Sequence, residues 1–411
     1  MLGGMTGASP VIPAPARAQP IRLGADEALA RAHALAPAFR ARAPETEAVR
    51  QLPLITIEEL FNTGLFDIAL PRRWGGSELG PDVWLEVIAE IAAACGSTGW
   101  VYGVLLGHVW LVSQFPLEAQ REVFEKPNTL VASLIRLGGS VEQVPGGYRW
   151  RGASGRFCSG VDYADWVVVG GAVQSGSNDG GPERRWFLIP RSDFAIEDDW
   201  FTTGLKGTGS KSIHVADAFV PDYRSISQSE LDSGNSPGRA VNPGPLYRLP
   251  GSTWTFVLSA TPIGIARGAV AAARDSLRRR LGTLPEEQVA DYSATLERFA
   301  RASTDVEVAY LLLQRQARRL MEAAERPLSP AERTVHRRDI GYAVQQARHA
   351  VNVLFELTGG SGIYESTTLQ RMWRDVNAAA AHFGLGWEPA AVAYARSTLD
   401  LPPAKSDRRA R

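Results

Sequence analysis

The sequence has few cysteines and no long apolar run. Its two cysteines, Cys95 and Cys158, lie far apart, with no CxxC pair and no accompanying histidine spacing. This argues against a structural zinc site and favours a reduced, cytoplasmic compartment. No stretch approaches the roughly 18–20 uninterrupted apolar residues that a membrane-spanning helix needs. We therefore expect a protein without a bound metal and without a membrane segment.

The sequence also lacks an excess of charge of either sign. Lys and Arg together number 44, as do Asp and Glu, so the formal net charge is +0. No whole-protein field then favours nucleic acid or an anionic membrane as a partner. Residues 1–20 are rich in Gly, Ala and Pro without an apolar core, which predicts a disordered leader and not a secretion signal.

Several common catalytic motifs are missing. There is no GxGxxG after a strand, no GxSxG, no HExxH and no EF-hand loop, so no site for a nicotinamide cofactor is visible. The nearest approach to a phosphate loop is residues 204–211, GLKGTGSK. There Ser210 separates the last Gly from Lys211, and a strand pattern follows in place of the helix whose N-terminus would hold a phosphate. We therefore predict that this segment is not a phosphate loop.

The hydrophobic pattern changes twice along the chain, and 411 residues are enough for two or three domains. Apolar residues recur at three- and four-residue spacing after Pro81, which predicts a helix, and residues 56–59 have the pattern of a helix capping box. Helices, then short β-branched and aromatic strands, then helices predict an α+β fold. The predicted divisions are a leader at 1–20, a helical domain at 21–128, a β-barrel or sandwich at 129–227, a loop or linker at 228–250, a helical bundle at 251–400 and a basic tail at 401–411.

Three segments carry candidate functional residues. Residues 95–101, CGSTGWV, precede His108; the simplest interpretation is a helix break plus a core histidine, and the functional one is that Trp100 and His108 face one cavity. Residues 155–166 have the composition of a strand and turn. Cys158 in that segment has no histidine near it in sequence, and we do not predict that it is a reactive thiol. The third segment joins the glycine cluster at 358–362, by default a helix C-cap, to Arg371, Arg374, Asp375 and His382.

Taken together, these segments and residues 204–211 resemble the acyl-CoA dehydrogenase superfamily, in its branch of two-component flavin-dependent monooxygenases. The resemblance covers roughly residues 50–400. It implies an N-terminal helical domain, a central antiparallel β-domain and a C-terminal four-helix bundle. It also implies a homotetramer built through the bundle, consistent with the small-residue faces of the predicted helices.

One position separates the chemistries within this superfamily. In the dehydrogenases a catalytic Glu lies about nine residues after the motif arginine, where this chain has Phe383 preceded by His382. Without a carboxylate base, removal of a proton from an acyl-CoA has no acceptor. Glu365 mimics a dehydrogenase tripeptide but precedes the Arg-Asp pair, so we do not assign it that role.

The resemblance implies the oxygenase component of an aromatic or phenol hydroxylase. Reduced FMN or FAD from a separate NAD(P)H:flavin reductase would react with O2 to give a C4a-hydroperoxide, while the protein supplies orientation and dryness. Ser159 would bond flavin N5, His382 would stabilise the peroxide side, and His108 with Ser133 would hold the hydroxyl of a small aromatic substrate. The remaining implied contacts are Phe383 with the substrate, and Trp100, Ser133, Phe157, Cys158, Arg248, Gly359 and Gly360 with the flavin.

Three other functions stay open from the sequence. The nearest is flavin-dependent N-oxygenation of an amino group, as in amino-sugar oxidising enzymes of this fold. The second is an acyl-CoA dehydrogenase, against which the residue at position 383 argues. The third is a non-catalytic scaffold that has lost the flavin.

Overall fold

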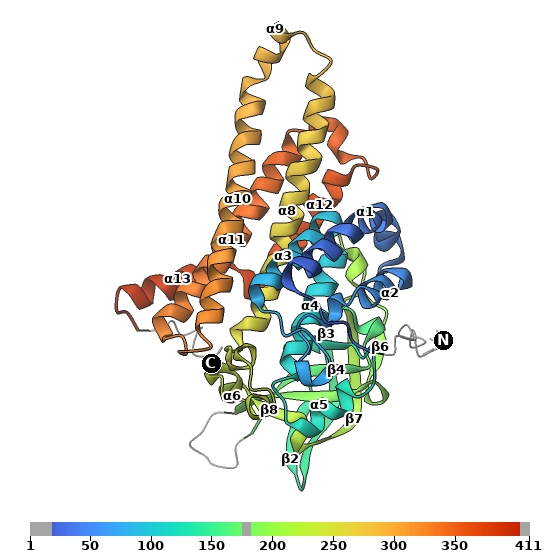
Figure 1. The fold of residues 1–411 in the computed structure, drawn as a ribbon, viewed down its shortest axis with the longest axis vertical. Helices are drawn as coiled ribbons and strands as arrows, with labels where there is room; N and C mark the ends of the chain where they lie inside the picture. Colours follow the sequence, from blue (N-terminus) through green and yellow to red (C-terminus); the bar gives the residue numbers. More distant parts are fainter. Residues whose placement is uncertain (1–18, 175–181, 403–411) are drawn as a thin grey trace.

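The computed structural model describes residues 19–174 and 182–402 of the chain (Figure 1). Most of the predicted leader and of the predicted basic tail lies outside these ranges. The described chain forms an N-terminal helical part, a β-domain and a C-terminal helical part. Figure 1 shows the β-domain at the opposite end of the molecule from the tip of the long helices.

The N-terminal part is helical, as predicted, and α3 begins at Pro81. Extended backbone at Cys95 ends α3 and separates it from α4. The predicted capping box is wrong, because α2 begins two residues before Thr56, whose hydroxyl accepts a hydrogen bond from Arg42. The elements are α1 (Ala25–Val49), α2 (Leu54–Asn62), η1 (Leu65–Asp67), η2 (Arg72–Trp74), α3 (Pro81–Ala94), α4 (Gly96–Val112) and α5 (Leu117–Phe124).

Helix α4 is buried along its whole length. Such a helix is apolar on all sides and packs where glycines allow neighbouring backbones to approach. A Cβ on Gly99 would lie 2.4 Å from Cβ of Ala92 in α3, and one on Gly264 would lie 2.4 Å from the carbonyl oxygen of Ala89. These close approaches fix α4 and the helix that carries Gly264, α8 (Ser252–Leu281), against α3. Helix α4 also contributes to the cavity described below.

The β-domain consists of two four-stranded sheets, in the orders β1-β4-β5-β8 and β2-β3-β7-β6. The pairing is antiparallel, as predicted, except that β1 runs parallel to β4. Trp150 and Phe187 pack edge to face between the sheets, with ring centroids 5.5 Å apart. The strands are β1 (Val131–Leu134), β2 (Ser140–Val144), β3 (Gly147–Cys158), β4 (Trp166–Val173), β5 (Glu183–Pro190), β6 (Ala195–Glu197), β7 (Lys211–Pro221) and β8 (Ser225–Ser227), with 3-10 turns η3 (Val161–Tyr163), η4 (Arg191–Asp193), η5 (Lys206–Thr208) and η6 (Asp222–Arg224).

The predicted loop or linker at 228–250 contains short helices. Ser227 accepts a hydrogen bond from the Glu230 backbone, and the Glu230 carboxylate accepts one from the Ser227 backbone. This capping box starts a helix within a stretch whose Gly and Pro content predicts a loop. The elements are α6 (Gln228–Ser233), α7 (Gly238–Val241) and η7 (Pro245–Arg248).

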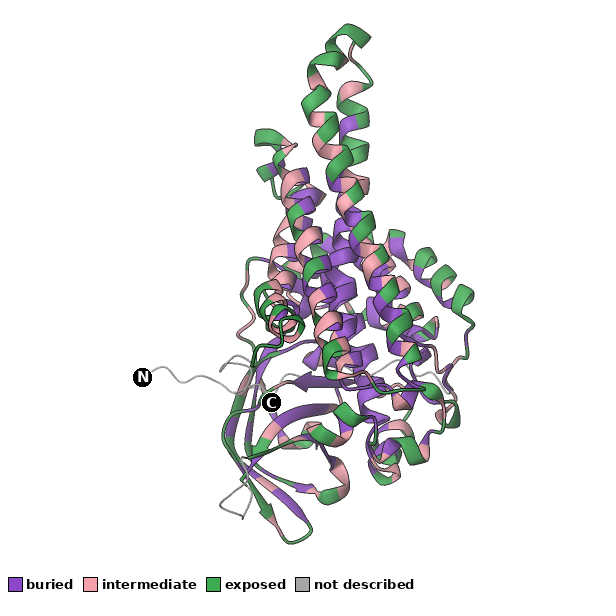
Figure 2. Cartoon of the chain, turned by 90° about the vertical axis from the view of Figure 1, so that its left-hand side faces the viewer, coloured by how far each residue is buried: buried purple, intermediate pink, exposed green. Residues whose placement is uncertain are grey.

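The C-terminal part contains a central helix, α8, covered by the other helices. By length and composition α8 could cross a membrane, but 78% of its most apolar window is buried inside the protein, as expected of a bundle core. Beyond the core, α8 and α10 project as a hairpin whose far end is largely exposed (Figure 2). The elements are α8 (Ser252–Leu281), α9 (Glu286–Val289), η8 (Ala290–Tyr292), α10 (Ser293–Glu322), α11 (Pro330–Glu356), η9 (Gly359–Ile363), α12 (Thr368–Ala380), η10 (Phe383–Leu385) and α13 (Trp387–Thr398).

Candidate active site

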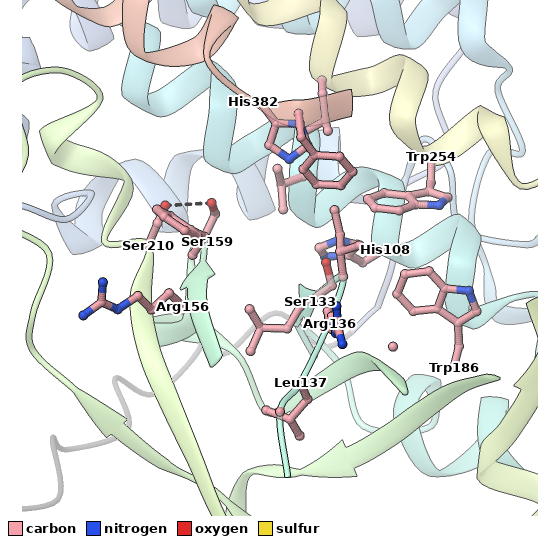
Figure 3. A pocket seen from close by; sticks show the side chains of 18 of the residues that line it. His108, Ser133, Arg136, Leu137, Arg156, Ser159, Trp186, Ser210, Trp254 and His382 are labelled. Carbon is pink, nitrogen blue, oxygen red and sulfur yellow. Dashed lines mark hydrogen bonds between the residues drawn. The ribbon is translucent and has the colours of Figure 1, made fainter. Parts of the chain in front are cut away.

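A cavity of about 1540 Å³ lies where the three parts of the chain meet. Its wall comes from α4, β1, β3, β4, β5, residues 200–210, α8 and the end of α12. Four arginines line it and, among the described residues, no Asp or Glu does. Figure 3 shows Ser159 and Ser210 on one side of the cavity, and Trp186 and Trp254 on the other.

Hydroxyl groups form a hydrogen-bonded chain on the first side. The indole Nε1 of Trp100 donates to Ser159 Oγ at 3.1 Å, and Ser159 Oγ lies 2.7 Å from Ser210 Oγ. Ser210 Oγ lies 2.7 Å from Thr208 Oγ1, and the Thr208 hydroxyl donates to the carbonyl of Leu205 at 2.9 Å. The chain therefore connects α4 to the backbone of the 200–210 segment.

His382 lies at the end of α12 and faces the cavity (Figure 3). Its Nδ1 accepts a hydrogen bond from the backbone N–H of Gly384 at 3.2 Å, so the neutral ring carries its proton on Nε2. Its ring packs edge to face on Trp100, with centroids 5.8 Å apart. Burial lowers the pKa of His382 to about 4. At neutral pH this residue is therefore an uncharged hydrogen-bond donor.

His108 lies on α4 with only 1% of its surface exposed. Its Nδ1 is 2.7 Å from the carbonyl oxygen of Val131, which can only accept, so Nδ1 carries the proton and Nε2 is an acceptor. Burial lowers the pKa of His108 to about 4, so the ring is neutral at pH 7. Ser133, on β1, lines the same part of the cavity. No residue in the described part of the chain bonds His108 Nε2, which leaves this acceptor for a ligand.

Two tryptophans form an aromatic wall near His108. Trp186 on β5 and Trp254 on α8 meet edge to face, with centroids 5.6 Å apart. The indole Nε1 of Trp186 donates to Gln228 Oε1 at 2.7 Å, which fixes the ring orientation. A planar apolar ligand would gain contact area on such a wall.

The 203–210 segment is held between the β-domain and the bundle. The backbone N–H of Leu205 donates to Asp375 Oδ1 at 2.6 Å, and Arg374 donates to the carbonyl of Thr203 at 2.8 Å. A Cβ on Gly204 would lie 2.2 Å from the carbonyl oxygen of Arg374, so only glycine allows this approach. Burial raises the pKa of Asp375 to about 6. The Arg-Asp motif of α12 thus positions the segment that carries Thr208 and Ser210.

Lys211 does not face the cavity. Its Nζ lies 2.8 Å from Asp162 Oδ1, and both side chains are buried, with 7% and 6% of their surfaces exposed. Strand β7 follows directly. An ammonium in a buried ion pair does not bind a ligand phosphate, so the structure agrees with the prediction that residues 204–211 are not a phosphate loop.

Phe157 lines the cavity mouth in an unusual backbone conformation. Its φ is +74°, in the left-handed region that side chains rarely adopt, and it lies in a bulge where β3 changes register against β7. The residue is 69% exposed, and its ring meets Trp200 edge to face with centroids 6.0 Å apart. Such bulges often re-aim side chains next to functional sites. Here the bulge presents Phe157 and Ser159 to the cavity.

The structure brings most of the predicted site residues together. The cavity is lined by Trp100, His108, Ser133, Phe157, Ser159, His382 and Phe383.

Four predicted flavin contacts do not line the cavity. Cys158 points between the two sheets, where burial raises the pKa of its thiol. Arg248 lies in η7, beside Gly234. Gly359 and Gly360 are exposed in η9, beyond the end of α11. Within one chain, these four residues are not positioned to touch a ligand in the cavity.

The sequence analysis did not single out several cavity residues. Thr208 and Ser210 belong to residues 204–211, which resemble the family but were given no role for a single residue. Trp186 and Trp254 lie in an ordinary strand pattern and an ordinary helix pattern, distant in sequence. The signal for Thr208 and Ser210 is their spacing of two residues, because hydroxyls that are buried close together require hydrogen-bond partners.

The cavity suits a flat aromatic cofactor with one polar edge. Trp100, Phe157 and Trp200 provide ring surfaces, the hydroxyl chain provides hydrogen bonds, and Arg156 provides a cation near the mouth. These groups match the fused rings, ring nitrogens and phosphate of a flavin. Glu365 is exposed and does not line the cavity, so no carboxylate of the described lining is placed as a dehydrogenase base.

Sequence models of two family domains match this chain. The acyl-CoA dehydrogenase N-terminal domain matches residues 27–127, and the acyl-CoA dehydrogenase C-terminal domain matches residues 256–387. The matched ranges correspond to the two helical parts, which supports the predicted fold class.

Characterised relatives cover almost the whole chain. The pigment production hydroxylase of Rhodococcus sp. (strain ATCC 21145) is 36% identical over 380 residues, 92% of this chain and 97% of that protein. The FADH(2)-dependent resorcinol hydroxylase, oxygenase component, of Rhizobium sp. (strain MTP-10005) is 34% identical over 405 residues, 95% of this chain and 97% of that protein. The crystal structure of the HsaA monooxygenase from M. tuberculosis has a TM-score of 0.85 and 33% identity, covering 93% of this chain and 99% of that chain.

Proposed function

This chain belongs to the flavin-dependent monooxygenases with the acyl-CoA dehydrogenase fold, as an oxygenase component, and we propose that it hydroxylates a phenolic aromatic substrate. The relatives named as hydroxylases support an aromatic substrate. When bound, reduced flavin from a separate NAD(P)H:flavin reductase would supply the electrons that activate O2, and O2 is the source of the oxygen atom that is transferred.

The observation that carries this proposal is the Nε2 of neutral His108, which has no partner among the described residues and lies buried beside Ser133 and an aromatic wall. A phenol hydroxyl donates to this acceptor while its ring lies against Trp186 and Trp254. Withdrawing the phenol proton toward His108 raises electron density on the ring carbons, which favours attack on an electrophilic oxygen. General-base assistance of this kind contributes about 100- to 10,000-fold.

The opposite side of the cavity would hold the flavin. We assign Trp100 and Phe157 to contacts with its ring, Ser159 to its N5 position, and the Nε2–H of His382 to the oxygen-bearing face. The donor set supports this arrangement, since the described lining offers hydroxyls and neutral rings and no carboxylate. A buried, largely apolar site also excludes water, which protects reactive oxygen species from decay.

The amino-group alternative is less well supported. The aliphatic amino group of an amino sugar is protonated at neutral pH, and burying an ammonium requires a nearby carboxylate. The described lining has none, whereas it has four arginines. A neutral phenol enters this cavity at a lower electrostatic cost.

The flavin is either reduced FMN or reduced FAD. The relative named as FADH(2)-dependent supports FAD. Anaerobic titration with each reduced flavin decides between them, and the tighter binder identifies the cosubstrate.

We also propose that the chain forms a homotetramer through its C-terminal helices. Val308 and Leu311 of α10 are 51% and 54% exposed, and Ile363 and Tyr364 at the end of η9 are 73% and 67% exposed. These exposed apolar side chains would be covered by other subunits. Light scattering after size exclusion tests the assembly. The two buried, unpaired cysteines support a cytoplasmic location.

The proposed function is tested by supplying reduced flavin directly. Enzyme mixed anaerobically with reduced FMN or FAD, and then with O2 and a panel of phenols, should form hydroxylated products without a reductase. Amino sugars and acyl-CoA thioesters serve as comparison substrates. Preferential turnover of the amino sugars, or oxidation of the thioesters, would contradict the proposal.

A further inference from the structure

The hydroxyl chain at the cavity has only one consistent hydrogen-bond direction. The Leu205 carbonyl can only accept, so the Thr208 hydroxyl donates its single proton to it. Thr208 must then accept from Ser210, and Ser210, having spent its proton, must accept from Ser159. The Trp100 indole can only donate, so its bond to Ser159 agrees with this direction.

The far end of this chain is fixed by the fold. The Leu205 carbonyl also accepts from the backbone N–H of Thr208 at 3.1 Å and from Trp200 Nε1 at 3.2 Å. The Leu205 N–H is held by Asp375. A carbonyl held from several sides cannot turn away, so the direction of the chain does not reverse while Thr208 and Ser210 are present.

This direction defines what Ser159 can offer to a ligand. Its only proton is used by Ser210, and one lone pair is used by Trp100. Its second lone pair is free to meet a ligand, because Ser159 lines the cavity with 7% of its surface exposed. Toward the cavity, Ser159 is therefore an acceptor and not a donor.

A flavin ring changes its hydrogen-bonding character at N5 with its redox state. Reduced flavin has an N5–H, which donates, whereas oxidised flavin has a bare N5 lone pair, which accepts. An acceptor at Ser159 pairs with the first and faces the second lone pair to lone pair, leaving both unsatisfied.

We propose that Ser210 and Thr208 are positioning residues that hold Ser159 as an acceptor, so that the cavity binds reduced flavin in preference to oxidised flavin. This inference rests on the proposed function, because it takes the flavin ring to meet Ser159. Neither Ser210 nor Thr208 needs to touch the flavin for this effect. The selection favours capture of the form that a reductase delivers and release of the oxidised form.

Equilibrium binding of both redox forms tests the proposal. Dissociation constants of oxidised and anaerobically reduced FMN and FAD are measured for the wild type, Thr208→Val, Ser210→Ala and Ser159→Ala. In Thr208→Val and Ser210→Ala the Ser159 proton is free to turn toward N5. Binding of oxidised flavin should then tighten, and the preference for reduced flavin should fall about tenfold, the value of one hydrogen bond. A tenfold change corresponds to about 30 mV in the midpoint potential of the bound flavin.

The direction of the change separates positioning from damage, because a disturbed site does not gain affinity for oxidised flavin. Ser159→Ala should instead weaken binding of reduced flavin, since the acceptor itself is lost. Ser212→Ala is the matched control: it removes a buried hydroxyl near the start of β7 that donates to Asp199 at 2.6 Å and not to the chain. Its preference should equal that of the wild type.

The failures of the two proposals are distinguishable. If the wild type binds neither reduced FMN nor reduced FAD, the proposed function is wrong. If the wild type binds reduced flavin and the preference is unchanged in both Thr208→Val and Ser210→Ala, the function stands and this inference is overturned. A loss of preference in Ser212→Ala as large as in those variants would overturn it too.

Discussion

The two sides of the cavity are built on different principles. On the side of Ser159 and Ser210, every hydroxyl proton has an assigned partner and the terminal carbonyl is held from several directions. On the side of Trp186 and Trp254, the wall is shaped by aromatic packing, and His108 supplies an unpaired acceptor. The first arrangement recognises hydrogen-bonding character, and the second recognises shape. We expect the first to act on the flavin and the second on the substrate.

The two cavity histidines show the same contrast at the level of one proton. Burial lowers the pKa of both His108 and His382 to about 4, so both are neutral at pH 7. The backbone at Nδ1 decides their roles: the Val131 carbonyl accepts from His108, whereas the Gly384 N–H donates to His382. The same side chain therefore presents an acceptor at one site and a donor at the other.

The largest effect is expected from His108→Ala. The substitution removes the acceptor for the phenol hydroxyl, so hydroxylation should fall by about 100- to 10,000-fold. Flavin binding should change little, because His108 lies on the substrate side. Product formation and flavin affinity are measured on the same preparation.

His336→Ala is the matched control for this variant. His336 is also buried, and its pKa is also lowered to about 4, but it does not line the cavity. Both variants should lose stability, and only His108→Ala should lose hydroxylation. Equal losses of activity per folded molecule would remove the distinction between the two sides.

His382→Ala tests the donor on the other side. We expect about tenfold more O2 to be released as H2O2 without product, because a factor of ten corresponds to the loss of one hydrogen bond. His382→Gln keeps an N–H donor and should restore part of the product yield. Product and H2O2 per O2 are measured together. Equal yields in the Ala and Gln variants would show that the donor is not what matters.

Asp375→Asn tests the support of the hydroxyl side. The folded-state pKa of about 6 lies above the ordinary 3.8 because of burial, so the folded protein holds this proton more tightly than the unfolded chain does. The free energy of unfolding therefore falls by at most about 3 kcal/mol as pH rises from about 4 to about 6, and this contribution is constant above pH 6. Asn keeps an acceptor for Leu205 N–H and does not titrate.

The difference in unfolding free energy between Asp375→Asn and the wild type should consequently shift in favour of the variant between pH 4.5 and 7.5. Urea unfolding at both pH values measures it. A difference that is independent of pH would contradict the raised pKa. Glu332→Gln is a control at a carboxyl whose pKa is lowered; it should show almost no shift in this window, because the stability linked to a lowered pKa is already present above about pH 4.5.

The sequence predicted the parts of this fold that depend on local pattern. Pro81 and the apolar spacing after it predict α3, and the strand pattern at Ile213–Val220 lies within β7. Trp100, Ser159 and His382 could be assigned to one site because each lies in a segment resembling a known family. The resemblance does not show how segments distant in sequence pack together. Gly359 and Gly360 were therefore assigned to a cavity that they do not line.

Hydrogen-bond direction could not be predicted from the sequence. The chain from Ser159 to Thr208 depends on the carbonyl of Leu205, whose φ of +50° is set by contacts with α12. The aromatic wall joins Trp186 and Trp254, which are distant in sequence and lie in elements with ordinary patterns. Both features arise from tertiary contacts between domains, and periodicity within one element carries no information about them.

The smallest expected effect concerns the aromatic wall. Trp186→Leu removes an aromatic ring on which the substrate would lie, and an aromatic contact is worth about 0.5–1.5 kcal/mol, so the KM for a flat aromatic substrate should rise by up to about tenfold, with flavin affinity unchanged. Trp74→Leu is a matched control, because Trp74 likewise donates to a glutamine, Gln120, and packs on Phe124, away from the cavity. A change in flavin affinity without a change in KM would reverse the assignment of the two sides. Since the wall acts through contact area and not through a proton, the KM effect should also be independent of pH.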